Sequence, residues 1–296
     1  MPGKPHAVTR RRMMVAAAGA FGGLALWPGP LPGRPRGEPD REPGHLRQSV
    51  SRWPFGEIPL PEFCRAVRDL GLEAIDLLGP DEWPVVADCG LMCSMGYPTD
   101  RRDFIVTGFN RVENHPMLLA ELEATIPLAA RAGVPNVIAM FGNREGLSDE
   151  AGIANCIAGL NRIKLLAETE GVTICVELLN SKVDHPDYQG DSTAFGVAVV
   201  EVVDSPRVKL LYDIYHMQIM EGDVIRTIRD NTDSIAHYHT GGVPGRHELD
   251  ETQELNYGAI AGAIADTGFD GFVAHEFEPT RDPLGSLAEA VAVCTV

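Results

Sequence analysis

The chain has 296 residues, of which 44% are hydrophobic and 23% are charged, so it could form one large domain or two smaller ones with a sizeable core. Its formal net charge is −17, and the charge is uneven, because residues 46–296 carry 18 Lys and Arg against 39 Asp and Glu. So acidic a body disfavours nucleic acid and anionic membranes as partners, whereas neutral sugars and cations are compatible with it.

The N-terminus is typical of an export signal followed by a linker. Thr9-Arg10-Arg11-Arg12-Met13-Met14 precedes an apolar stretch, rich in Ala and Gly, that ends at Trp27, and this arrangement resembles a twin-arginine signal. Residues 28–45 are dense in Pro, Gly and charge, which predicts a disordered linker. We therefore expect a signal over residues 1–27 and a periplasmic or extracellular protein. A disordered basic tail is the alternative, and the sequence leaves open both leader cleavage and a membrane tether through an uncleaved leader.

From residue 46 onward, short β-rich runs alternate with amphipathic stretches at helical spacing. The expected strands cover residues 48–51, 74–78, 91–96, 136–141, 173–179, 209–215, 235–240 and 272–277. The expected helices cover residues 61–70, 111–132, 149–170, 193–203, 223–230, 256–267 and 283–293. Several of the helical stretches are followed by Gly before the next strand, which is typical of a helix end.

Eight strands that alternate with helices in about 250 residues predict a closed (β/α)8 barrel, the TIM barrel, over residues 46–296. An open doubly wound sheet is the alternative. The first expected strand has no Gly-x-Gly-x-x-Gly turn after it, and this disfavours the open sheet. Nor do we expect an organic cofactor.

The fifth to eighth expected strands each end in an apolar run that carries one potential metal ligand. These residues are Glu177, Asp213, His239 and Glu276. The carboxyl ends of barrel strands meet at one mouth, so the four side chains are expected to converge there. Desolvating such groups is costly unless they are compensated, and one shared divalent cation would compensate all four.

Three carboxylates and one imidazole form a mixed set of oxygen and nitrogen donors. Such a set suits Mg²⁺, Mn²⁺, Co²⁺ or Zn²⁺ with positions left open for substrate oxygens. The absence of thiolate from the set argues against a structural zinc site. Taken singly, Asp213 and His239 could each be a hydrogen-bonded strand end, and Glu276 a rim residue in a salt bridge.

Three longer strings connect this site to a known family. They are Leu210-Leu211-Tyr212-Asp213-Ile214-Tyr215-His216-Met217-Gln218-Ile219-Met220-Glu221-Gly222-Asp223, then Pro244-Gly245-Arg246-His247-Glu248 and Glu254-Leu255-Asn256-Tyr257. Together they resemble the hydroxypyruvate isomerases of the xylose-isomerase-like barrel superfamily, over roughly residues 46–285. The resemblance implies the barrel fold and metal dependence.

The same resemblance assigns roles to individual residues. It implies that Glu177, Asp213, His239 and Glu276 bind the metal and that Glu177 and Glu276 also form the acid/base pair. Substrate contacts are implied for His216 and Arg246. One position departs from the family pattern, because bacterial hydroxypyruvate isomerases commonly carry Gln where this chain has His239, as ketose 3-epimerases do.

Polar residues near these positions are further candidates. Asn180, Lys182 and His185 follow Glu177 in an expected loop and are candidates for substrate contact, although loop polarity explains them equally well. His237 shares a strand face with His239 one layer deeper, where it would either support the site or fill the barrel. The remaining candidates beside the mouth are Trp53, Asn143 and Arg144.

These residues can support proton transfer next to a carbonyl group. A divalent ion that holds adjacent carbonyl and hydroxyl oxygens stabilises an enediolate, while Glu177 and Glu276 remove and return the proton. We therefore expect an aldose-ketose isomerase that acts on a small hydroxy-carbonyl compound, first of all hydroxypyruvate, which would become tartronate semialdehyde.

Two other functions compete with the isomerase. One is a ketose 3-epimerase or another sugar isomerase or epimerase, and the other is an exported, metal-containing sugar-binding barrel without turnover. A DNA-repair endonuclease on a related barrel is disfavoured by the acidic body. The expected partner is thus a small hydroxy-carbonyl or sugar molecule, with no nucleic acid, and a homo-oligomer is left open.

Overall fold

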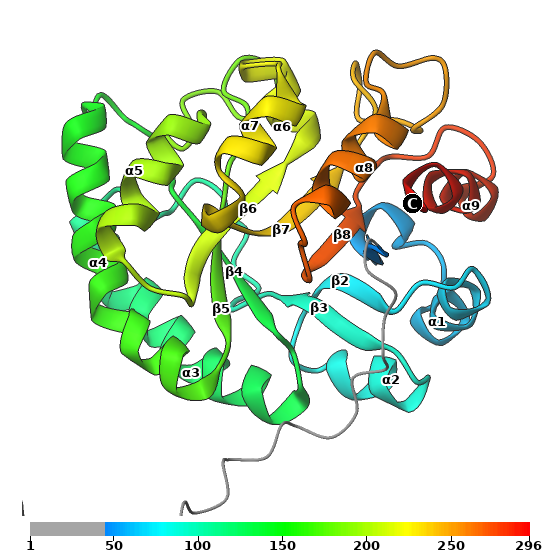
Figure 1. Cartoon of the computed structure of the whole chain (residues 1–296). Coiled ribbons are helices and arrows are strands. Elements are labelled where there is room, and N and C mark those ends of the chain that lie inside the picture. Colours follow the sequence, from blue (N-terminus) through cyan, green and yellow to red (C-terminus); the bar gives the residue numbers. More distant parts are fainter. Residues whose placement is uncertain (1–44) are drawn as a thin grey trace, which may run out of the picture. The chain divides into compact units, whose positions relative to one another are not determined.

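The computed structural model describes residues 45–296, so the expected signal over residues 1–27 and the expected linker up to residue 44 lie outside the described residues. Eight parallel strands close into a barrel in the order of the sequence, which confirms the expected TIM barrel (Figure 1). The strands are β1 Arg47–Ser51, β2 Ala74–Leu78, β3 Met92–Gly96, β4 Asn136–Met140, β5 Thr173–Glu177, β6 Val208–Asp213, β7 Ile235–Thr240 and β8 Phe272–His275.

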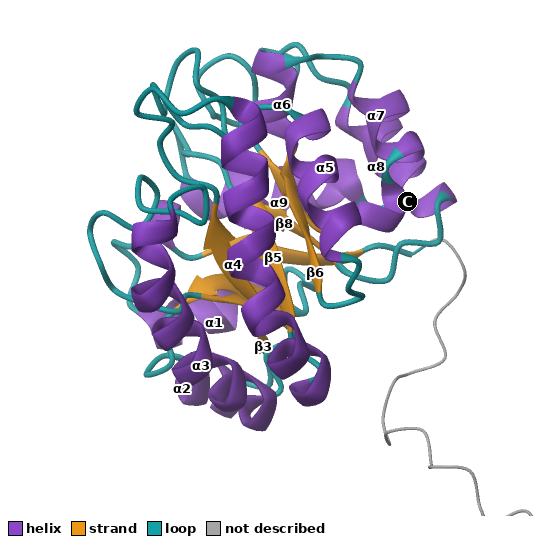
Figure 2. Cartoon of the chain, turned by 90° about the vertical axis from the view of Figure 1, so that its left-hand side faces the viewer, coloured by secondary structure: helices purple, strands orange, loops and turns teal. Residues whose placement is uncertain are grey.

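Helices surround the strands on the outside of the barrel (Figure 2). They are α1 Leu60–Asp69, α2 Trp83–Asp88, α3 His115–Ala132, α4 Asp149–Glu170, α5 Thr193–Val203, α6 Ile214–Met220, α7 Val224–Asp230, α8 Tyr257–Asp266 and α9 Pro283–Cys294. Short 3₁₀ turns cover Trp53–Phe55, Val112–Asn114 and Thr232–Ser234. Within residues 45–296, no helix has the length and apolar character needed to cross a membrane.

Two helices, α2 and α6, were not expected from the sequence. The α2 helix has only six residues and buries two of them, Trp83 and Val86, so it has too few turns for a periodic apolar stripe. The α6 helix begins at Ile214, inside the segment expected to continue the sixth strand to residue 215. That extension of the strand was wrong.

A side-chain cap explains why the sixth strand stops at Asp213. The Oδ1 atom of Asp213 accepts a hydrogen bond of 3.0 Å from the backbone N–H of His216, as an N-cap residue does in the first turn of a helix. The other oxygen, Oδ2, accepts a hydrogen bond from Arg246 at the barrel mouth. One carboxylate thus ends β6, starts α6 and serves the site.

The register of the strands places each candidate ligand opposite the candidate on the next strand or two residues away from that position. Asp213 is the partner of His239 across β6 and β7, and His239 is the partner of Ala274, two residues before Glu276, on β8. Glu177, the last residue of β5, is the partner of Leu211 on β6. Because alternate residues of a strand share a face, the four candidates lie together at the carboxyl end of the barrel.

A close backbone approach supports the end of β4 beside this mouth. The N–H of Phe109 donates to the carbonyl of Met140 at 3.0 Å, and the N–H of Asn110 donates to the carbonyl of Phe141 at 2.9 Å. The segment that leads into α3 therefore pairs with the chain as it leaves β4. A Cβ atom on Gly108 would lie 2.1 Å from the carbonyl carbon and oxygen of Phe141, so only glycine fits there.

We expect Gly108→Ala to lower the free energy of unfolding by about 1–3 kcal/mol, because the added methyl group would push the two backbone segments apart. Gly262→Ala is the control, since Gly262 lies within α8 with open space around its Cβ position, and alanine there is neutral or stabilising by up to about 1 kcal/mol. Urea unfolding measures both changes. Equal midpoints for Gly108→Ala and the wild type would contradict the close approach.

Candidate metal centre

The structure brings the four expected ligands together at the mouth of the barrel. Glu177, Asp213, His239 and Glu276 are buried, and one potential ligand atom of each lies within 4.8 Å of the others. The Nδ1 atom of His239 is 2.6 Å from Glu276 Oε2, 3.4 Å from Glu177 Oε1 and 3.8 Å from Asp213 Oδ2. Strands far apart in the sequence thus supply one compact set of donors.

The imidazole of His239 is oriented as a metal ligand would be. Its Nε2 lies 2.8 Å from a carboxylate oxygen of Asp76, and this contact places the ring proton on Nε2 when the ring is neutral. Its Nδ1 has no hydrogen-bond partner of suitable geometry among the described residues, although it is buried and faces three carboxylates. When the ring is neutral, Nδ1 has a lone pair that faces three carboxylates, and this arrangement fits a divalent cation.

Arg246 lies among these carboxylates. Its Nη2 is 2.7 Å from Asp213 Oδ2 and also bonds Glu276 Oε2, and its Nε donates to the backbone carbonyl of Glu276 at 3.1 Å. The loop that carries Arg246 is fixed by a bond from the N–H of Glu278 to the Arg246 carbonyl. Arg246 therefore partly neutralises the ligand set.

The two glutamates differ in how readily they lose a proton. Burial raises the pKa of Glu177 to about 7, and His239 offsets only part of this rise. Burial also acts on Glu276, but His239, then Arg246, and the indole of Trp53, which donates to Oε1 at 2.5 Å, hold its pKa well below the usual range. Glu276 is therefore ionised, while Glu177 can hold or release a proton near neutral pH.

His216 and Asn180 form a fixed pair next to Arg246. The amide Nδ2 of Asn180 lies 2.6 Å from Nδ1 of His216, and the amide oxygen accepts two backbone N–H groups of the same loop, from Val183 and Asp184. On the other side of the ring, Arg246 Nη1 lies 2.7 Å from His216 Nε2. Asn180 thus orients His216 and does not line the cavity itself.

A cavity of about 690 Å³ opens beside the ligands. One part of its wall is polar and includes Glu177, Glu276, His216, Arg246 and His185. The wall also includes apolar side chains, namely Leu77, Phe104, Ile138, Met140 and Leu179. The cavity therefore combines charged and apolar groups, as ligand-binding sites commonly do.

Three sequence candidates point elsewhere. The ammonium of Lys182 donates to the carbonyls of Ile219 and Met220 at the end of α6. Arg144 pairs with Asp149 and Asp191, and Asn143 forms an isolated bridge with Tyr188. The structure does not bring Lys182, Arg144 or Asn143 into the cavity wall, whereas it does place Trp53 and His185 there.

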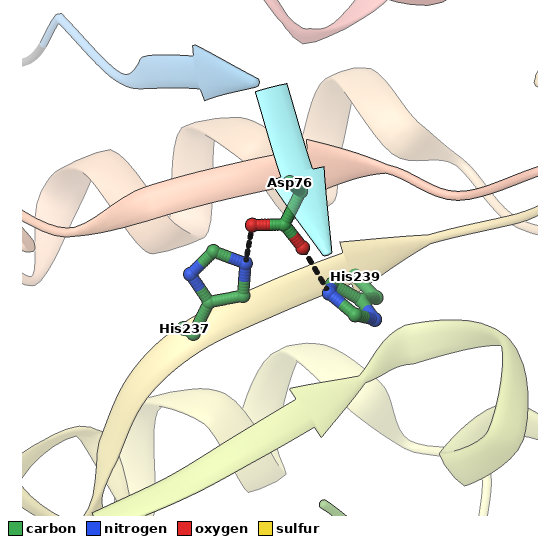
Figure 3. A group of neighbouring side chains, drawn as sticks. All are labelled: Asp76, His237 and His239. Atoms are coloured by element: carbon green, nitrogen blue, oxygen red, sulfur yellow. Dashed lines mark hydrogen bonds and ion pairs between the residues drawn. The ribbon is translucent and has the colours of Figure 1, made fainter. Parts of the chain in front are cut away.

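Asp76 on β2 is a site residue that the sequence reasoning missed. It is fully buried and lies between the two strand-seven histidines, with His237 Nε2 3.2 Å from Oδ1 (Figure 3). Burial by itself raises the pKa of Asp76, but His237 and His239 lower it below the usual range, so the carboxylate is charged. Asp76 is a charged residue inside the apolar run Ala74–Leu78. The four ligands were identified by the same pattern, so the sequence could also have indicated Asp76.

Comparison with known proteins gives a family match and several relatives. A family model described as a xylose isomerase-like TIM barrel matches residues 108–294. A human protein named "Putative hydroxypyruvate isomerase" is 32% identical over 112 residues, which are 38% of this chain and 40% of the human protein. This chain thus matches two fifths of the length of that relative.

Two further relatives align over most of their length. A 2-oxo-tetronate isomerase of Haemophilus influenzae is 26% identical over 242 residues, which cover 79% of this chain and 93% of that protein. A crystal structure described as AP endonuclease, family 2, from Brucella melitensis has a TM-score of 0.72 at 25% identity and covers 82% of this chain and 97% of that one.

After treatment with a chelator, the protein is expected to bind one Mn²⁺ or Zn²⁺ ion per chain, at least about tenfold more weakly at pH 6 than at pH 8. Glu177 has a raised pKa of about 7, and the carboxylates raise that of His239 despite its burial, so both groups hold protons at pH 6 that must leave before an ion binds. Isothermal titration calorimetry checks the affinity.

Replacement of His247, a surface residue, by Gln provides the control, because its ring contacts only the backbone of Glu278. The pH dependence should persist in that variant. An affinity that is the same at both pH values would show that Glu177 and His239 are not ligands.

Proposed function

Because the chain belongs to the xylose isomerase-like TIM barrel family, we propose that it is a divalent-metal-dependent isomerase. Its substrate is a small hydroxy-carbonyl compound, and the leading reaction is hydroxypyruvate to tartronate semialdehyde. The names of the human and Haemophilus influenzae relatives support isomerisation of such compounds. Glu177, Asp213, His239 and Glu276 would hold the ion, which when bound supplies positive charge beside the substrate oxygens.

The observation that carries the proposal is that two carboxylates of the ligand set, Glu177 and Glu276, adjoin the same cavity. Without a bound ion, their surroundings move their pKa values in opposite directions. Such a division is typical of acid/base pairs, because a group that titrates near the working pH transfers protons well. Glu177 is accordingly the residue that would take the proton from carbon, and the ionised Glu276, which also adjoins the cavity, can accept or relay one.

The surroundings of His216 support a place for a substrate oxygen. Asn180 and Arg246 both direct donors at this ring, yet a neutral imidazole has only one acceptor nitrogen. Burial, followed by the charge of Arg246, lowers the pKa of His216 well below its usual range, so the ring is neutral. With Nδ1 accepting from Asn180, Nε2 carries the proton, and a substrate oxygen beside Nε2 and the adjacent guanidinium could accept from both.

The size of the cavity favours a second candidate, a ketose epimerase. A volume of about 690 Å³ is in the range of sites for much larger ligands than a three-carbon acid. A five- or six-carbon ketose could therefore contact both the carboxylates and apolar wall residues such as Ile138 and Phe104. The two reactions differ in the carbon to which the proton returns.

The test is proton exchange in deuterated water, followed by NMR, with hydroxypyruvate and with free ketoses. In isomerisation, deuterium should enter the former carbonyl carbon, which becomes the hydroxyl-bearing carbon of the product, whereas 3-epimerisation places it on the carbon next to the carbonyl, whose configuration inverts. We expect Glu177→Gln to lower kcat/KM at least about a hundredfold with little change in thermal stability, because the amide cannot exchange the proton.

Glu123→Gln is the matched control, since it makes the same change on an exposed part of α3 and should keep full activity. Near-normal exchange by Glu177→Gln would rule out the proposed mechanism. Metal binding without exchange of any substrate would instead favour the exported binding barrel.

The acidic body argues against a nucleic-acid substrate, even though the Brucella melitensis structure is described as an AP endonuclease. A protein that binds DNA neutralises phosphates with Lys and Arg, and residues 46–296 have twice as many acids as bases. We accordingly propose a small-molecule substrate and no nucleic-acid partner.

We further propose that residues 1–27 direct export by the twin-arginine route. Changing both Arg10 and Arg11 to Lys is expected to keep the protein in the cytoplasm, because this pair is the feature that resembles the signal. Cell fractionation and immunoblotting check the result. Unchanged export of the double variant would contradict the proposal.

A further inference from the structure

Asp76 lies directly beneath the candidate metal centre and touches one of its ligands. Its Oδ2 is 2.8 Å from Nε2 of His239, while its Oδ1 accepts the hydroxyl of Ser94 at 2.6 Å and is 3.2 Å from Nε2 of His237 (Figure 3). All four of these side chains are fully buried. A charged group in such a place is costly unless it makes specific contacts.

We propose that Asp76 is a positioning residue that holds His239 ready to bind the divalent cation. By accepting the Nε2–H of His239, the carboxylate fixes both the ring orientation and the neutral tautomer in which Nδ1 has a free lone pair. This inference rests on the proposed metal-dependent function, because it concerns the same ion. Asp76 contacts neither the cavity nor the other three ligands.

The position of Glu276 shows why such a residue is needed. Its Oε2 lies 2.6 Å from Nδ1 of His239, so a neutral ring released from Asp76 could place its proton on Nδ1 and donate to Glu276 instead. In that arrangement, the proton would occupy the Nδ1 lone pair of His239 and would be hydrogen-bonded to a lone pair of Glu276. Neither lone pair would then be free to bind the ion. Asp76 therefore acts against a competing hydrogen bond inside the site.

A second ion held by Asp76, His237 and His239 is the rival explanation, since one ligand atom of each also lies within 4.8 Å of the others. Two contacts disfavour it. Oδ1 of Asp76 already accepts from Ser94, and a second ion on Nε2 of His239 would have to displace the proton shared with Asp76. His237 instead faces the same carboxylate from below, with its ring 5.1 Å from that of His239.

The test compares Asp76→Asn with Asp76→Leu. Asparagine can still offer one oxygen to His239, so Zn²⁺ and Mn²⁺ affinity should fall about tenfold, whereas leucine offers no acceptor and the loss should approach a hundredfold. Calorimetric titration of the full chain measures both. In the Zn²⁺-loaded protein labelled with ¹⁵N-histidine, an exchange-protected Nε2–H signal of His239 should be present in the wild type and lost in Asp76→Leu.

Ser94→Ala and His237→Gln are the matched controls. Each removes a different contact to Oδ1 of Asp76 in the same buried cluster and leaves the bond to His239 in place. Both should lose some thermal stability but keep metal affinity within about threefold of the wild type and keep the Nε2–H signal. If the Asp76 variants lost affinity only because the buried cluster packs differently, Ser94→Ala and His237→Gln would lose as much affinity as Asp76→Leu.

Three results would overturn the proposal: wild-type affinity in Asp76→Leu, equal losses in Ser94→Ala, or two bound ions per chain of which His237→Gln loses one. Catalytic turnover is not among the readouts. If the wild type binds the ion and the Asp76 series behaves as expected, but no substrate exchanges deuterium, the proposed reaction fails while the role of Asp76 stands.

Discussion

The structure of the barrel mouth depends on compensating the charge of buried carboxylates. Glu177, Asp213 and Glu276 lie within a few ångströms of one another with little access to water, and mutual repulsion would separate them without positive partners. Arg246 and His239 are the partners in the described structure. The loop that delivers Arg246 and the orientation of the His239 ring therefore follow from the same electrostatic requirement.

This requirement also explains why two chemically identical side chains have different properties. Glu276 is surrounded by donors, namely the indole of Trp53, the guanidinium of Arg246 and the ring of His239, whereas the main effect on Glu177 is loss of solvent. The residue type does not decide which carboxylate carries the proton. Which carboxylate carries the proton depends on its neighbours, which come from the turn after β1, from β7 and from the loop after β7.

Much of the fold could be predicted from the sequence because the barrel repeats one local pattern. Apolar runs at strand length recur eight times, several of the helices between them are followed by glycine, and the ligand of each late strand lies beside its own apolar run. Helix α6 could not be predicted from this pattern, because Asp213 is both the last residue of β6 and the N-cap of α6, so no loop separates the two elements.

The contacts between distant residues could not be predicted in the same way. Asp76 and His239 are 163 positions apart, and only the closed barrel brings them together. Lys182 illustrates a second difficulty, because a polar loop residue near a ligand has many possible partners, and here it bonds the end of α6. Spacing along the chain predicts which strand end a residue occupies but not the direction of a long side chain.

The closure between β8 and β1 gives the site a role in the assembly of the fold. Trp53 follows β1 and bonds Glu276 after β8, so the first and last quarters of the barrel meet at the same carboxylate. A chain that has formed only its C-terminal strands would contain all four ligands but neither Trp53 nor Asp76 to orient them. An ion would bind tightly only to the assembled and oriented set of ligands. Its binding would therefore stabilise the fully closed barrel relative to partly formed ones.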